Sequence, residues 1–127
     1  MAVTFSNPNS VHTPLGLYSH TAHAPARPLL FLSGQLGVRP DGTTPEGIAA
    51  QADQAFANIV ALLTAHGRAP EDIIKLTTFI VAGADGQAVR DARLKHLGAH
   101  RPASTAVYVS ALMAPEWLVE VEAIVAG

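Results

Sequence analysis

The chain has 127 residues and a mass of 13.2 kDa, enough for one hydrophobic core and too little for two, so residues 1–127 are interpreted as a single domain. Apolar residues make up 49% and charged residues 14%. So little charge on a small domain indicates that copies of the chain cover part of its surface. A formal net charge of −2 argues against nucleic acid and anionic membranes as partners, and the lack of cysteine excludes disulfides, thiolate zinc sites and cysteine nucleophiles.

The N-terminal residues MAVTFSNPNS lack the basic and apolar segments of a signal peptide. No apolar run approaches the roughly 20 residues that span a bilayer, so we expect a cytoplasmic protein that does not enter membranes. Residues 1–14 are polar and proline-rich, which predicts an extended arm in front of the domain.

The first half of the chain predicts two strands and a helix. Residues 15–24 favour a weak strand, and residues 28–33 favour a stronger one that ends at Gly34. A loop follows, and Thr44-Pro45-Glu46 then has the order of a helix start: a hydroxyl cap, a proline and an acid. Apolar residues recur at three- and four-residue spacing from Ile48 to Leu63, and Gly67 is the expected stop.

The second half predicts a strand, a helix and two closing strands. Residues 72–83 are rich in β-branched residues, Asp85 is the expected cap of a helix that stops near Gly98, and residues 100–109 and 118–125 alternate as strands do. The order is β-β-α-β-α-β-β, and the class is α+β.

Two of these strands have faces of different character. Ile74, Leu76, Thr78 and Ile80 share one face of residues 73–81, and Val119, Val121, Ala123 and Val125 share one face of residues 118–125. The opposite faces mix apolar residues with Lys75, Glu120 and Glu122. Such a mixed face is typical of a subunit interface that encloses a polar cleft, so an oligomer with sites between its subunits is predicted.

Six segments, in this order and spacing, resemble those of the Rid family (YjgF/RidA-type proteins) over about residues 15–126. They are YSH at 18–20, LLFLSGQLGV at 29–38, GIAAQADQAFANIVALLTAHG at 47–67, DIIKLTTFIV at 72–81, RPAST at 101–105 and LVEVEAIV at 118–125. The resemblance implies a chorismate-mutase-like fold, with two helices on one face of a mixed sheet. It also implies a homotrimer whose sheets form a central barrel, with three small-molecule clefts between subunits.

The best-known members of this family hydrolyse 2-imino acids to 2-oxo acids and ammonia without a cofactor. Carried over to this sequence, the resemblance implies that Tyr18, Ser33 and Gly34 bind substrate and that Glu120 positions the hydrolytic water. A carboxylate in a semi-apolar cleft is a suitable general base. No cofactor and no metal are expected.

The chain departs from the family in the turn that binds the substrate carboxylate. Deaminating members carry an arginine in a P-A-R-[ST] turn, and a guanidinium is suited to bidentate binding of a carboxylate. Here the turn ends in Ser104 and Thr105, so Ser104 replaces the arginine. Its loss predicts weak 2-imino acid deamination, unless Arg39 or Arg101 compensates. Arg101 is expected on the opposite strand face from Ser104.

Several residues also have a structural interpretation. Glu120 is a surface carboxylate or a site residue, and its apolar neighbours favour the site. Glu122 is more consistent with a structural ion pair to Lys75 across a subunit interface. Ser33 could simply end its strand, and Tyr18 could be a core or interface aromatic residue.

Trp117 either walls the cleft or packs in the trimer, and the sequence leaves both open. The histidine pairs His20/His23 and His96/His100 lack the spacing and the acidic partner of a zinc site.

Two functional classes follow. The first is a small hydrolase or deaminase, in which Glu120 activates water toward an imine, an enamine or a related reactive metabolite. The second is a trimer that binds or senses a small metabolite without chemistry. Ribonuclease activity, an older label of the family, is disfavoured because no basic groove is evident.

Overall fold

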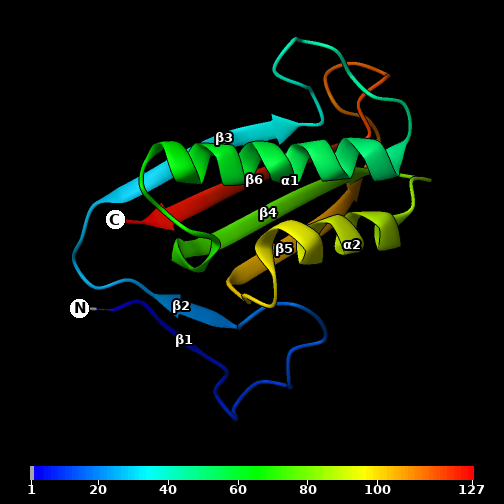
Figure 1. Cartoon of the computed structure of the whole chain (residues 1–127). Coiled ribbons are helices and arrows are strands. Elements are labelled where there is room, and N and C mark those ends of the chain that lie inside the picture. Colours follow the sequence, from blue (N-terminus) through cyan, green and yellow to red (C-terminus); the bar gives the residue numbers. More distant parts are fainter. Residues whose placement is uncertain (1) are drawn as a thin grey trace.

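The computed structural model describes residues 2–127, so that of the predicted arm only Met1 lies outside the described residues. A four-stranded sheet is covered on one face by two helices, and a separate two-stranded sheet lies beside it (Figure 1). The elements are β1 (Thr4–Ser6), β2 (Thr21–His23), β3 (Leu29–Leu36), α1 (Ile48–Ala65), the 3-10 helix η1 (Pro70–Asp72), β4 (Ile73–Val81), α2 (Gly86–Leu97), β5 (Ala103–Val109) and β6 (Val119–Ala126).

The strand order of the large sheet is β3-β6-β4-β5. β6 is antiparallel to both of its neighbours, β3 and β4, whereas β4 and β5 are parallel, so the sheet is mixed. The predicted α+β class is therefore confirmed. β3 and β5 form the two opposite edges of this sheet.

The core lies between the sheet and the helices. Phe56, Ile59 and Leu63 of α1 are fully buried against strand residues that include Leu76 and Val121. The apolar face predicted for residues 118–125 is buried throughout, as the alternation indicated. At the start of β4 the buried residue is Ile73 and not Ile74, which was expected on the apolar face and is only half-buried. The register with β6 shifts between Ile73 and Lys75, which accounts for this difference.

The start predicted for the first helix is wrong. α1 begins at Ile48 without a side-chain cap, because Gly47 has a φ of 88°, outside the helical region, and the helix cannot continue back to Pro45. Thr44 instead accepts a hydrogen bond from the Trp117 indole (3.3 Å). The second helix begins as predicted, since the Asp85 carboxylate accepts from the Gln87 N–H (2.9 Å), and it ends at Gly98.

The predicted end of the second strand is also wrong. β3 passes through Ser33 and Gly34 and continues to Leu36, with its register against β6 shifted between Leu32 and Gln35. This irregularity, typical of a β-bulge, places Ser33 and Gly34 in the interior of the strand.

Within residues 2–24, the predicted arm contains a strand that was not expected, and the segment 15–24 contains less strand than predicted. Only Thr21–His23 of the segment 15–24 forms a strand, and it pairs with β1, which the sequence did not indicate. A single bridge between Ser19 and Ala103 joins this segment to β5.

A buried glutamine holds the start of α1 against the loop before β6. The Gln51 amide donates to Pro45 O (3.1 Å) and Glu116 O (2.8 Å) and accepts from the Leu118 N–H (2.9 Å). Gly37 lets the loop after β3 pass close to the same part of α1, because a Cβ at position 37 would lie 2.5 Å from the Gln51 carbonyl oxygen. The loop before α1, which contains Pro45, and the loop before β6, which contains Glu116, consequently lie side by side beyond the end of the sheet (Figure 1).

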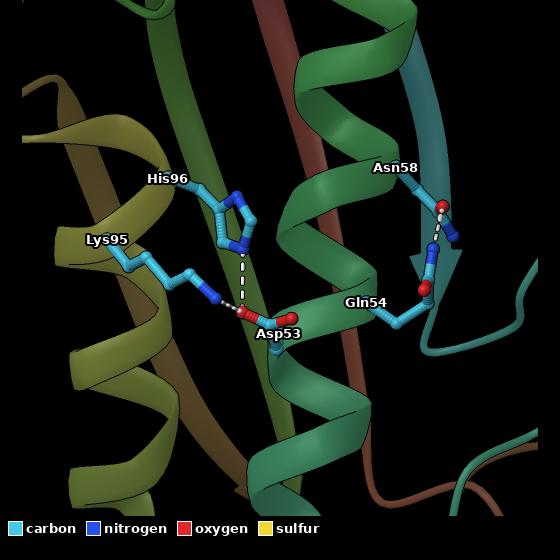
Figure 2. A network of polar contacts seen from close by, with 5 residues as sticks. All are labelled: Asp53, Gln54, Asn58, Lys95 and His96. Carbon is cyan, nitrogen blue, oxygen red and sulfur yellow. Dashed lines mark hydrogen bonds and ion pairs between the residues drawn. The ribbon is translucent and has the colours of Figure 1, made fainter.

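Polar side chains also join the helices. Asp53 of α1 accepts from Lys95 Nζ and His96 Nε2 of α2, both at 2.8 Å (Figure 2). On the other side of α1, Gln54 donates to Asn58 (2.7 Å), whose own amide donates to carbonyl oxygens at the end of β3 and just after it.

None of the helices within residues 2–127 has the length and apolar character to cross a membrane.

Candidate active site

At the bulge in β3, two of the predicted site residues, Gly34 and Glu120, lie against each other, and Ser33 is the next residue of the strand. Gly34 lies beside Glu120 of β6, and a Cβ at position 34 would overlap the Glu120 carboxylate. Ser33 precedes Gly34 and is exposed. The missing side chain at position 34 therefore makes the room that the Glu120 carboxylate occupies. We call Ser33, Gly34 and Glu120 the β3–β6 group.

Glu120 and Glu122 both lie on the sheet face that carries no helix. A hollow of about 430 Å³ is lined by both glutamates, Phe79 and Met113, and a second hollow of about 300 Å³ is lined by Glu122, Ser33 and Lys75 among others. Glu120 is half-buried and Glu122 is exposed. This face mixes charged and apolar side chains, as the alternation in the sequence predicted.

Lys75 is not paired with Glu122 within the described part of the chain. Its ammonium donates instead to Thr105 Oγ1 (2.7 Å) on the neighbouring strand β5. Pairing of Lys75 with Glu122 of another subunit stays a prediction.

At the other edge of the sheet, two predicted residues lie near an arginine that was not predicted. Ser104 of β5 accepts a hydrogen bond from Arg93 of α2 (3.2 Å) and donates to Pro102 O (3.2 Å). Tyr18, in the segment that leads to the Ser19–Ala103 bridge, accepts at its hydroxyl from the Leu15 N–H (3.0 Å). Thr105 faces away from Ser104, toward Lys75 on the open face. We call Tyr18, Ser104 and Arg93 the β5 group.

These two groups do not meet within one chain, because β3 and β5 are opposite edges of the sheet. Trp117 belongs to neither group, since its indole donates to Thr44 in the loop before α1. The histidines considered for metal binding are also dispersed. His96 contacts Asp53, His100 contacts Ile73 O and His20 contacts His12 O, and no set of three metal-ligating side chains is found among residues 2–127.

Arg93 was missed in the sequence, although a signal for it was present. It lies four residues after the buried Val89 and four before the buried Leu97, so it falls on the buried face of its helix. Neither arginine considered as a substitute takes this place. Arg39 donates to Thr43 Oγ1 in an exposed loop, and the side chain of Arg101 is exposed.

Comparison with known proteins assigns this arrangement to a family. The family model described as "Endoribonuclease L-PSP" matches residues 9–127. The chain belongs to this family, the Rid family. It is 34% identical over 113 residues to a RutC family protein of Pyrococcus horikoshii, covering 87% of each chain. It is 32% identical over 114 residues to a 2-iminobutanoate/2-iminopropanoate deaminase of Dermatophagoides farinae, covering 88% of this chain and 87% of the relative.

Solved structures agree with the fold. The Rid-family protein YyfB of Yersinia pestis superimposes with a TM-score of 0.87 at 26% identity, covering 99% of both chains. RidA of Psychrobacter superimposes with a TM-score of 0.72 at 29% identity, covering 97% of this chain and 98% of the other. The expected chorismate-mutase-like fold of the Rid family is thereby confirmed. Within this Rid fold, the β3–β6 group and the β5 group are the candidate site residues.

Proposed function

We propose that this Rid protein is a homotrimeric hydrolase that deaminates a small imine or enamine in clefts between its subunits. The observation that carries the proposal is the Glu120 carboxylate seated over Gly34, next to Ser33. This pair of strands presents the Glu120 carboxylate and the Ser33 hydroxyl to two hollows on the open side of the sheet, and Glu122 lines both hollows.

Hydrolysis of an imine requires that the protein position the substrate and a water molecule and supply one general base. A water held by Glu120 attacks the imine carbon while its proton passes to the carboxylate. The proton then passes to the nitrogen, which gives a carbinolamine. Glu120 takes the remaining hydroxyl proton and delivers it to the same nitrogen, so the C–N bond breaks, ammonia leaves and the carbonyl forms. The reaction consumes one water and involves no oxidation or reduction, so it needs no redox cofactor.

Two observations favour a site between subunits. The β3–β6 group and the β5 group lie at opposite edges of the sheet, so a second chain could bring its β5 edge to the β3 edge of the first. The open face also exposes Phe31, a residue that is 66% accessible, beside charged residues. Such a surface suits contact with copies of the chain.

The test compares two glutamates of the same strand. Imines are generated in situ from neutral and carboxylate-bearing amines, and ammonia release is followed for the wild-type protein, Glu120→Gln and Glu122→Gln. Glu120→Gln keeps size and hydrogen bonding but removes the base, so turnover should fall about 100-fold or more while the assembly persists. Glu122→Gln is the matched control and should change turnover much less.

A non-catalytic trimer that binds or senses a small metabolite is the alternative. It gains support if no imine is hydrolysed faster than in buffer although the protein is folded and assembled. It also gains support if Glu120→Gln leaves the rate unchanged.

A further inference from the structure

The Arg93 guanidinium lies against Ser104, the residue of β5 that replaces the arginine of deaminating family members. The arginine comes from α2, and its guanidinium donates to the carbonyl oxygen of Leu17 and to Ser104 Oγ. Both acceptors are neutral. The side chains of Ser104 and Ala106 are short, so β5 leaves room beneath the helix for this long side chain.

The charge of Arg93 is not compensated by any acid. No ion pair of Arg93 is found among residues 2–127. The nearest charges are those of other arginines: burial first, and then Arg90 and Arg101, lower the pKa of Arg93 to about 10. A cation withdrawn from water among like charges is unfavourable unless an anion joins it.

A cavity adjoins this guanidinium. It has a volume of about 140 Å³ and is lined by Arg93, Arg90 and Thr78 together with the apolar side chains of Leu17, Val89 and Ala106. This is about the volume of five water molecules, which suits a carboxylate with a short carbon chain. Two guanidinium groups would hold the carboxylate, and the apolar side chains would contact the chain.

We propose that Arg93 replaces, from helix α2, the arginine missing at position 104, and that it binds the carboxylate of a small apolar carboxylic acid in this cavity. The Nη2 hydrogens of Arg93 donate to Leu17 O and Ser104 Oγ, so its Nε and Nη1 N–H groups and the Arg90 guanidinium are left for the carboxylate. A neutral amide accepts such charge-assisted hydrogen bonds less well, and phosphate is bulkier in so small a space. The inference deepens the proposed function, on which it rests for the role of the site. The presence of Ser104 in place of an arginine argued against a carboxylate-bearing imine as substrate. With Arg93 as the carboxylate-binding residue, this substrate class is again expected.

Binding is measured first, because it does not depend on turnover. The full-length protein in its native assembly is titrated calorimetrically with butanoate, with the isosteric butanamide and with inorganic phosphate. Butanoate should bind at least about 10-fold more tightly than either of the others. Equal binding of butanoate and butanamide would overturn the inference, and tighter binding of phosphate would overturn the assignment to carboxylates.

Variants then assign the binding to Arg93. Arg93→Gln should weaken butanoate binding by about 30-fold or more, as expected for truncation of one partner of a buried charge pair. Arg39→Gln is the matched control and should bind like the wild type, since Arg39 lies in an exposed loop. Unchanged binding by Arg93→Gln would contradict the inference.

The double variant Arg93→Ser/Ser104→Arg returns the guanidinium to the turn. It should bind butanoate within about 10-fold of the wild type, which also separates loss of the guanidinium from loss of folding. A folded double variant that does not bind would count against the inference.

Failure of this inference and failure of the proposed function give different results. Arg93-dependent butanoate binding without any imine hydrolysis would support the inference and defeat the hydrolase. Imine hydrolysis untouched by Arg93→Gln would support the hydrolase and defeat the inference.

Discussion

The Glu120 carboxylate occupies the space that any side chain at position 34 would need. The backbone of Gly34 does not have a positive φ, so glycine is required there for space and not for conformation. Gly34 lies within the irregularity between Leu32 and Gln35, where β3 and β6 are out of regular register. The position of the candidate base is thus set by the absence of a side chain on the neighbouring strand.

Gly34→Ala should lower imine hydrolysis about 10- to 100-fold, because displacement of a catalytic group by about 1 Å has effects of this size. The Glu120 side chain can swing away, so the melting temperature should change little. Gly16→Ala is the control, since a Cβ there would be no closer than 4.0 Å to its nearest neighbour, Tyr18. Unchanged activity in Gly34→Ala would show that the carboxylate works from another position.

The sequence could indicate the β3–β6 group, but it could not indicate how the β5 group is completed. Glu120 stands in an alternating apolar strand, and Ser33 and Gly34 stand in a motif, so both signals are local. Arg93 contacts Ser104 only because α2 folds back over β5, and that contact depends on tertiary packing. An arginine on the buried face of a helix was the one local sign of it.

At the scale of elements, Asp53 connects the two helices. Hydrogen bonds from Lys95 first and from His96 second hold the pKa of the Asp53 carboxyl below its usual 3.8. The carboxylate form is therefore favoured by folding. Its stabilisation is present above pH 3.8 and is lost as the pH falls below that value toward the pKa of the folded state.

Asp53→Asn should consequently lower stability at neutral pH and not in acid. The side chain of Asp53 is 45% exposed, so the expected loss at pH 7 is modest, about 1 kcal/mol or less. Melting temperatures of the two proteins, measured from about pH 7 to about pH 3, should converge as the Asp53 carboxylate takes up its proton. A difference that grows in acid would contradict this role. Asp91→Asn, on the exposed face of α2, is the control.

Element types could be predicted well, and their ends less well. Apolar periodicity gave both helices and the four strands of the large sheet, because it reflects burial against one core. The predicted start of α1 is wrong because Thr44-Pro45-Glu46 resembles a helix cap only locally. The positive φ of Gly47 and the contacts of Gln51 with the neighbouring loops set the first residue of the helix at Ile48. β1 is only three residues long and has no such periodicity.

At the scale of the whole molecule, the chain presents two half-sites at opposite edges and an open sheet face that mixes charged and apolar side chains. Our account expects three copies of 13.2 kDa, about 40 kDa in solution, with the β3–β6 group of one subunit facing the β5 group of the next. In that arrangement each cleft contains Glu120 from one chain and Arg93 from another.

Subunit mixing tests this central claim most directly. Glu120→Gln removes the base from one half-site, and Ala106→Trp fills the Arg93 cavity in the other, so each variant alone should be inactive. Refolded together in equal amounts, they should recover about a quarter of the wild-type rate of imine hydrolysis, because that fraction of clefts pairs two intact halves. A mixture that stays inactive, although sedimentation shows mixed trimers of about 40 kDa, would contradict a site shared between subunits.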